Sequence, residues 1–145
     1  MQKFHFSFPS SQKIFEISDD IFGLIIDTMD AELAERQRIK LIISELFMNA
    51  YLHGNNADPA KSIEVVLEFD CDRFAVEVRD AGKGLTRKRF NELAESGEDY
   101  ESSSGRGMRI ISKLCDSVDI FKDDNEKFCI RVVKKLKTIP VSANG

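Results

Sequence analysis

Glu45 and Asn49 are the two residues of this chain whose types and spacing best fit catalysis. They stand four positions apart in a segment with helical apolar spacing, so both project from one helix face, which His53 continues. A carboxamide oxygen is a hard, neutral ligand that suits Mg²⁺, and a carboxylate can accept a proton from an attacking hydroxyl or water. Taken alone, the pair is better explained as an ordinary solvated helix face.

Asp80-Ala-Gly-Lys-Gly84 is a second candidate, because it directly follows a predicted strand. An aspartate at a strand end can accept a hydrogen bond from an exocyclic amine such as that of adenine. Gly82 and Gly84 would let the backbone turn sharply and approach a flat ring closely. For this segment alone, a loop with convenient glycines is an equally good explanation. It is not a P-loop, because the chain has no Gly-x-x-x-x-Gly-Lys-Ser/Thr pattern.

Gly105-Arg-Gly-Met108 is the third candidate and opens a predicted helix. The free backbone N–H groups and the dipole at a helix N-terminus favour a bound phosphate, and Arg106 can add charge-assisted hydrogen bonds. A flexible loop ending at a helix cap explains the segment alone equally well. A dinucleotide fingerprint is excluded, because no third glycine follows at the required place and no strand closely precedes it.

Alternating strands and amphipathic helices must position these segments. Strands are predicted where apolar residues take every second position, at 4–8, 63–69, 74–78, 118–121 and 128–133. Helices are predicted at 13–29, 31–52 and 107–115, with a further short helix at 86–95. Because hairpins dominate, we expect an α/β (α+β) fold. It is a two-layer sandwich in which three helices cover one face of a mixed, mostly antiparallel sheet.

The expected organisation is a single domain over residues 1–137. Residues 96–104 are rich in serine, glycine and acidic residues with almost no apolar side chain, which predicts a mobile lid. Residues 138–145 are predicted to form a flexible tail.

Composition narrows the class of protein. The chain has 145 residues, 42% hydrophobic and 32% charged, as is typical of a soluble globular protein. A net charge of −4 argues against nucleic acid as the main partner, and no apolar run is long enough to span a membrane. The three cysteines form no Cys-x-x-Cys pair and only two histidines are present. We therefore expect reduced thiols in a cytoplasmic protein rather than a disulfide or a zinc site.

In their order, the three segments resemble the boxes of the GHKL (Bergerat-fold) ATPases, whose fold is the histidine-kinase-like ATPase fold. The Glu45–Asn49 helix resembles the N box, Asp80-x-Gly-x-Gly84 the G1 box and Gly105-x-Gly107 the G2 box, while the serine-rich stretch resembles the ATP lid. Within that superfamily, the Glu-x-x-x-Asn-Ala-x-x-His-Gly pattern and the small size resemble the bacterial anti-sigma factor serine/threonine kinases. The resemblance extends from Phe4 to about Val133.

This resemblance implies an ATP and Mg²⁺ site with assigned roles. Asn49 would ligate Mg²⁺, Glu45 would be the general base, and Asp80 would read the adenine amino group above a pocket floor formed by Gly82 and Gly84. Gly105, Arg106, Gly107 and Met108 would hold the phosphates. His53 either contacts the nucleotide or only packs beside it.

The same resemblance implies a protein kinase that phosphorylates a STAS-domain anti-sigma antagonist on serine and so switches partners to control a sigma factor. A homodimer is also implied. Two alternatives remain within the superfamily: an ATP-dependent protein-binding regulatory module without kinase activity, and a detached histidine-kinase-type ATPase domain. The sequence argues against the second alternative, because no helical hairpin with a phosphoacceptor histidine precedes the predicted ATP site. An interaction domain that binds no nucleotide would require all three segments to be coincidental.

Overall fold

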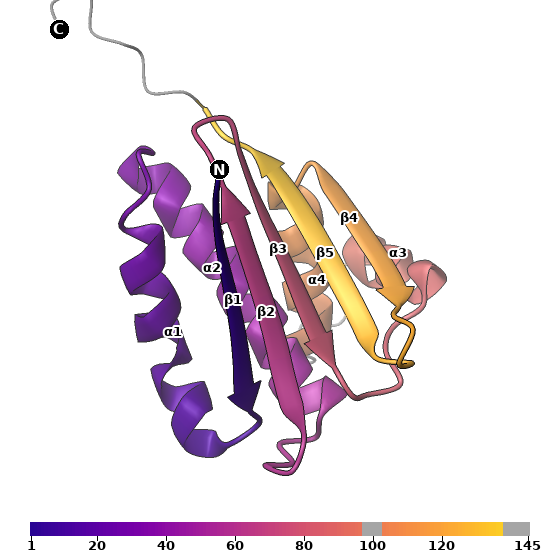
Figure 1. Ribbon diagram of the computed structural model, residues 1–145. Helices are drawn as coiled ribbons and strands as arrows, with labels where there is room; N and C mark the ends of the chain where they lie inside the picture. The colour runs from indigo at the N-terminus through magenta and orange to yellow at the C-terminus, as the bar shows by residue number, and fades with distance from the viewer. Residues whose placement is uncertain (97–102, 138–145) are drawn as a thin grey trace, which may run out of the picture.

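A computed structural model of the chain describes residues 1–96 and 103–137. In chain order its elements are β1 (Gln2–Pro9), α1 (Gln12–Ile26), α2 (Leu33–Asn49), the π-helical turn η1 (Ala50–Gly54), β2 (Ser62–Phe69), β3 (Arg73–Asp80), α3 (Arg87–Ser96), α4 (Ser103–Leu114), β4 (Ser117–Lys122) and β5 (Phe128–Lys135). The strands form a sheet in the order β1-β2-β3-β5-β4, and each neighbouring pair is antiparallel (Figure 1).

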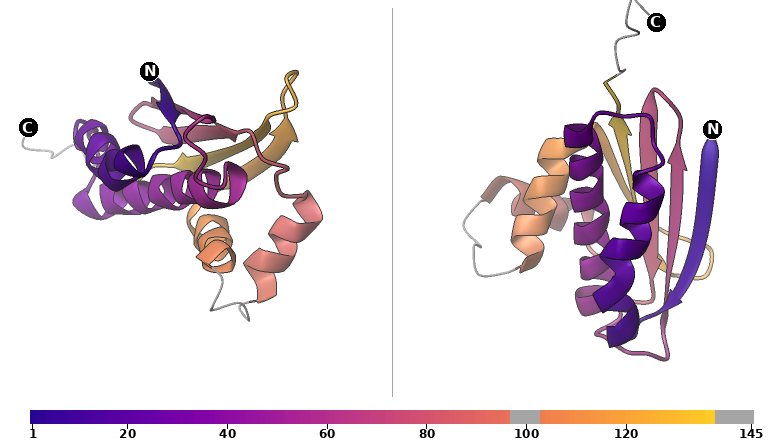
Figure 2. Two further views of the ribbon diagram at one scale, coloured as in Figure 1. Left: turned by 90° about the horizontal axis from the view of Figure 1, so that it is seen from below. Right: turned by 90° about the vertical axis from the view of Figure 1, so that its left-hand side faces the viewer.

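The predicted fold class is confirmed. The helices gather on one face of the sheet, which gives a two-layer α+β sandwich (Figure 2). The sheet is antiparallel throughout the described residues, where a mixed sheet was expected. β3 and β4 run in the same direction, but β5 lies between them and pairs antiparallel with both. The short helix expected at 86–95 is present as α3, which packs beside α4.

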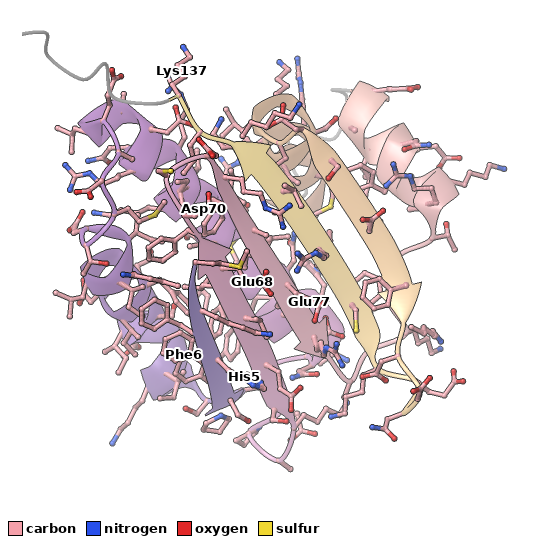
Figure 3. All side chains as sticks on the ribbon, turned by 45° about the horizontal axis from the view of Figure 1, so that its top comes forward. His5, Phe6, Glu68, Asp70, Glu77 and Lys137 are labelled. Atoms are coloured by element: carbon pink, nitrogen blue, oxygen red, sulfur yellow. The ribbon has the colours of Figure 1, made fainter. Side chains whose placement is uncertain are left out.

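Strict alternation of side chains makes the sheet one-sided. On β2, Ile63, Val65 and Leu67 are fully buried under the helices, and the residues between them are half-buried on the other face. That other face is polar. Figure 3 shows His5, Glu68 and Glu77 lying on it, and Glu68 pairs with Lys3 at 3.8 Å and Arg131 at 3.6 Å. The prediction of a sheet with one buried face is therefore correct.

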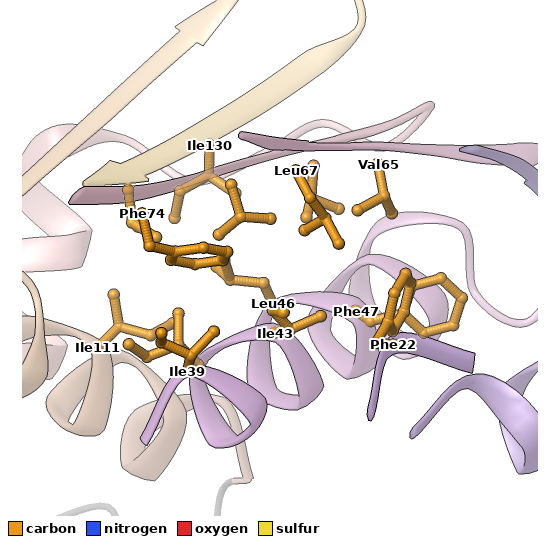
Figure 4. Packing of buried hydrophobic residues seen from close by; sticks show 14 of the residues in the cluster. Phe22, Ile39, Ile43, Leu46, Phe47, Val65, Leu67, Phe74, Ile111 and Ile130 are labelled. Atoms are coloured by element: carbon orange, nitrogen blue, oxygen red, sulfur yellow. The ribbon is translucent and has the colours of Figure 1, made fainter. Parts of the chain in front are cut away.

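The core lies between the sheet and α2, which α1 and α4 flank on either side (Figure 4). Leu46 and Phe47 of α2 are almost fully buried, and Phe22 of α1 meets the Phe47 ring at a centroid distance of 5.5 Å. Such edge-to-face contacts add to the free energy gained from burial. Helix α2 is thus the centre of the packing, with neighbours on most of its circumference.

Not every apolar residue of α1 faces the core. Ile17 is 46% exposed and Leu24 is 74% exposed, whereas Phe22 and Ile26 are buried. This helix lies at the β1 edge of the layer, where Phe22 packs edge-on against the Phe6 and Phe8 rings, and it contacts α2 on one side, so only part of its circumference is covered. Its start is capped by Ser11, whose side-chain oxygen accepts a hydrogen bond from the Ile14 N–H at 3.3 Å.

Helix α4 begins four residues earlier than predicted, at Ser103 instead of residue 107. Serine and glycine are poor helix formers, so local propensity indicated a loop there. Buried Met108 and Ile111 hold the helix against α2, and this packing overrides propensity. The ends of the predicted lid therefore belong to α3 and α4, while its remainder, like the predicted tail, lies outside the described residues. The domain limits stay a prediction.

Among the described residues, no helix combines the length and the apolarity that crossing a membrane would require.

A buried ion pair fixes the start of α2 to the sheet. Glu35 is 2% exposed, and its carboxylate lies 2.9 Å from the Lys134 ammonium of β5 and 3.3 Å from the Arg38 guanidinium. Breaking such a pair from one side leaves a buried charge without its main partner. The pair therefore holds α2 at a fixed height on the sheet.

We expect Lys134→Met to lower the free energy of unfolding by about 3 kcal/mol, because Glu35 would keep its charge in a buried place. The matched control is the double variant Glu35→Leu/Lys134→Met, which should recover most of the loss. Urea unfolding followed by circular dichroism measures both. A single variant as stable as the wild type would contradict the assigned role.

Candidate functional site

A pocket of about 240 Å³ opens where the C-terminal end of α2 meets the ends of β3 and β5 and the helices α3 and α4. Its lining consists of Leu46, Asn49, Ala50, His53, Gly54, Val78, Asp80, Gly84, Leu85, Arg89, Leu93, Met108, Phe128 and Ile130. Most of these are apolar, and the polar groups are few. This composition is typical of a small-molecule site.

The pocket unites residues from all three segments singled out in the sequence. Asn49, His53, Asp80, Gly84 and Met108 line it directly. The other predicted residues do not line it, and each has a different place. Glu45 and Gly107 lie in contact next to it, Gly82 packs on the backbone of Gly54, Arg106 is exposed, and Gly105 belongs to the first turn of α4.

Asp80 lies buried at the end of β3. It is 4% exposed, and its Oδ1 accepts a hydrogen bond from the Gly82 N–H at 2.8 Å. A Cβ added at Gly54 would come within 2.6 Å of either carboxylate oxygen, so the backbone of η1 closes one side of this group. Burial raises the pKa of Asp80 to about 6, against the opposing effects of the Gly82 hydrogen bond and of Lys127 and Lys61. The carboxylate keeps spare acceptor capacity toward the pocket.

Gly84 and Phe128 form the wall beside Asp80. Gly84 has φ of +82°, a conformation that only glycine adopts without strain. A side chain there would also run into the Phe128 ring, since an added Cβ would lie 2.3 Å from Cδ2. Phe128 is the strand partner of Asp80 in the β3–β5 ladder. The glycine thus lets the loop lie flat against an aromatic ring at the edge of the pocket.

Glu45 and Asn49 lie side by side beneath α4. A Cβ added at Gly107 would come 2.6 Å from the Glu45 Oε2 and 3.5 Å from the Asn49 Nδ2, so the missing side chain is what allows this approach. Within the described residues, the Glu45 Oε2 and both polar atoms of the Asn49 amide are buried without a hydrogen-bond partner. Buried polar groups are normally paired, so unpaired ones need an explanation.

The orphaned atoms fit a cation and its anionic ligand. An amide oxygen and a carboxylate oxygen are the kinds of donor that Mg²⁺ takes from proteins, usually together with phosphates. Burial raises the pKa of Glu45, and the nearby charge of Asp19 adds to this, whereas Arg106 lowers it. A carboxylate with a raised pKa is better suited to accept a proton near neutral pH.

A π-helical turn separates Asn49 from the end of the helix. Residues Ala50–Gly54 form η1, which ends with the Asn55 N–H donating to the Ala50 carbonyl at 2.8 Å. Single π-turns are rare and occur often at functional sites. Because of the wider turn, both His53 and Gly54 line the pocket. The helix face predicted to carry Glu45, Asn49 and His53 therefore also includes Gly54.

Asn55 holds three separate segments together and was missed by sequence reasoning. It is fully buried, and its Nδ2 donates to the Ser10 Oγ at 2.6 Å and to the Ser62 carbonyl at 2.9 Å. Its Oδ1 accepts from the Ala81 N–H at 2.8 Å, next to Asp80. In the sequence it stands only as part of a helix-ending turn, because partners so distant along the chain leave no local pattern.

Because α4 begins at Ser103, the backbone N–H groups available to a phosphate are only in part those of the residues expected from the sequence. The free N–H groups of a helix belong to its first four residues, which here are Ser103 to Arg106. Gly107 and Met108 come after them, so in this conformation their N–H groups face intrahelical carbonyls. Met108 instead lines the pocket, and the residue is only 3% exposed.

The raised pKa of Asp80 predicts a pH-dependent cost to folding. Since the folded protein holds this proton up to about pH 6 and the unfolded chain only to about 3.8, unfolding free energy falls as pH rises between these values. We expect Asp80→Asn to be more stable than the wild type at pH 7, by on the order of 2 to 3 kcal/mol, and to lose this advantage near pH 4.

The control for that comparison is Asp124→Asn, at an exposed position. Thermal unfolding of the three proteins from pH 4 to pH 7.5 measures the effect. An Asp80→Asn advantage that does not change with pH would contradict the assigned burial cost.

The comparisons with known proteins agree on one family. The model of the "Histidine kinase-like ATPase domain" family matches residues 25–134. A protein named "Anti-sigma F factor" from Anoxybacillus flavithermus is 28% identical over 110 residues, covering 74% of this chain and 75% of the relative. A protein of the same name from Clostridium perfringens is 27% identical over 119 residues, covering 78% and 81%.

A solved structure supports the fold. The "Mycobacterial sensor histidine kinase MprB" matches with a TM-score of 0.54 at 12% identity, covering 94% of this chain and all of that one. The boxes seen in the sequence, the pocket they share and the family match agree, and this chain belongs to the histidine kinase-like ATPase family.

Proposed function

We propose that this protein is an anti-sigma-factor-type serine kinase. It binds ATP with Mg²⁺, phosphorylates a STAS-domain anti-sigma antagonist on serine, and exchanges that antagonist for a sigma factor. The observation that carries the proposal is that a buried strand-end carboxylate, Asp80, and the unpartnered amide of Asn49 line one pocket, with the unpartnered Glu45 Oε2 lying next to it beneath Gly107. The relatives named "Anti-sigma F factor" support the regulatory part.

The lining offers separate groups for the base and for the phosphates of ATP. Asp80 is the hydrogen-bond acceptor for the adenine amino group, and the apolar walls of Val78, Phe128 and Ile130 suit the faces of the ring. Asn49 lines the same pocket from α2, where it would hold Mg²⁺ with its amide oxygen. Bound there, the cation supplies charge neutralisation for phosphoryl transfer.

Glu45 is the proposed base. Its carboxylate would accept the proton of the substrate serine hydroxyl, a role that its raised pKa favours. In the conformation described, Gly107 lies against the Glu45 Oε2. A serine can therefore reach this carboxylate only after the start of α4 moves away, so we propose that the α4 start is a movable cover.

The same cover favours one second candidate, a nucleotide-responsive binding module that transfers nothing. If α4 never uncovers Glu45, ATP would act only by reshaping the surface. The likeness to a sensor histidine kinase does not bear on this choice, because at 12% identity it supports the fold alone.

Nucleotide binding is tested by thermal stability. Mg²⁺ and ATP at one hundred times the dissociation constant should add about 2.7 kcal/mol to the unfolding free energy. Asn49→Ala should lose the part of the shift that depends on Mg²⁺, while Asn125→Ala, in an exposed turn, should keep it. Absence of any shift with the wild type would remove the proposed function altogether.

Catalysis is tested by Glu45→Gln. We expect it to keep ATP binding and to lose at least 100-fold in the rate of phosphate transfer to a serine of a STAS-domain protein captured from the native lysate. Glu32→Gln, exposed at the start of the same helix, is the control. Equal transfer by Glu45→Gln and wild type would contradict the assigned base, and no transfer by either would favour the binding module.

A further inference from the structure

Arg89 lies in the first turn of α3 and lines the pocket, as does Leu93 one turn later. This wall of the pocket comes from none of the three segments singled out in the sequence, and no sequence pattern pointed to it. Leu93 is 5% exposed and anchors the helix. Arg89 therefore projects from a helix face that is fixed by packing.

Charge distinguishes Arg89 from the rest of the lining. Among the lining residues in the described ranges, it is the one lysine or arginine, and the one carboxylate is Asp80. The chain as a whole carries a net charge of −4. A nucleotide with several phosphate charges entering such a pocket gains from a cation close by.

Arg87 and Arg89, both in the first turn of α3, make different contacts. Arg87 donates a hydrogen bond to the Val118 carbonyl of β4 at 2.6 Å, and its guanidinium lies 5.4 Å from the centre of the Phe90 ring. Arg87 thus ties α3 to the sheet. Arg89 has a loose contact with the Glu92 carboxylate at 3.4 Å, and both side chains are about half exposed. Such a surface pair contributes little, so it is easily exchanged for a stronger anion.

We propose that Arg89 is a nucleotide-binding residue that pairs with phosphate oxygens of the bound ATP, a proposal that rests on the proposed function. A guanidinium presents its donors as a planar fork that matches two phosphate oxygens, which a lysine does not reproduce. Because α3 packs along α4, the contact would also link phosphate binding to the helix that covers Glu45. Arg89 leaves its pair with Glu92 when it binds.

The test is isothermal titration of the full chain with Mg-ATP, Mg-ADP and adenosine. The variants are Arg89→Ala and Arg89→Lys, with Lys88→Ala as the matched control, since Lys88 is exposed on the same helix and does not line the pocket. We expect Arg89→Ala to lose roughly tenfold or more in affinity for ATP and ADP and almost nothing for adenosine. Arg89→Lys should fall between, and Lys88→Ala should match the wild type.

The outcomes separate the two proposals. Equal ATP affinity for Arg89→Ala and Lys88→Ala overturns the role of Arg89 and leaves the proposed function standing. An equal loss for adenosine and ATP also overturns it, because the contact would then be to the base or the sugar. A wild type that binds none of the three ligands overturns the proposed function itself. Melting curves check that the Arg89 variants are folded.

Discussion

The burial of the Asp80 carboxylate against the backbone of η1 is the constraint on which the site depends. The group is taken out of water with one backbone hydrogen bond in return, and its pKa rises to about 6 as a consequence. Such a cost is tolerated where a ligand supplies the missing partner. The fold meets it by fixing the surrounding loop with Asn55, whose amide joins the ends of β1 and β2 to Ala81.

Helix α2 also holds polar side chains out of water at the site. Its central position, against the sheet and between α1 and α4, buries the Glu45 side chain and the polar atoms of the Asn49 amide. Burying these atoms without hydrogen-bond partners costs free energy, and packing alone does not explain why the fold does so. Because Gly107 closes over them, access to Glu45 is set by the position of α4, so binding and catalysis would be linked through one helix–helix contact.

Local patterns were enough to predict the elements and five of the fourteen residues that line the pocket. Helical spacing placed Glu45 and Asn49 together, and the end of a strand placed Asp80. Residues whose role arises from tertiary pairing were not predictable: Phe128 lies beside Gly84 only because β5 pairs with β3, and Arg89 reaches the pocket only because α3 packs on α4. The early start of α4 was missed because packing outweighed the low helix propensity of its residues.

A crystal structure of the protein with Mg²⁺ and a non-hydrolysable ATP analogue tests the proposed site most directly. We expect the adenine amino group within about 2.7 to 3.2 Å of an Asp80 carboxylate oxygen. We also expect the metal on the Asn49 amide oxygen and the start of α4 displaced from Glu45. An analogue bound elsewhere, or a pocket closed by its own side chains at saturating ligand, would contradict the proposed site.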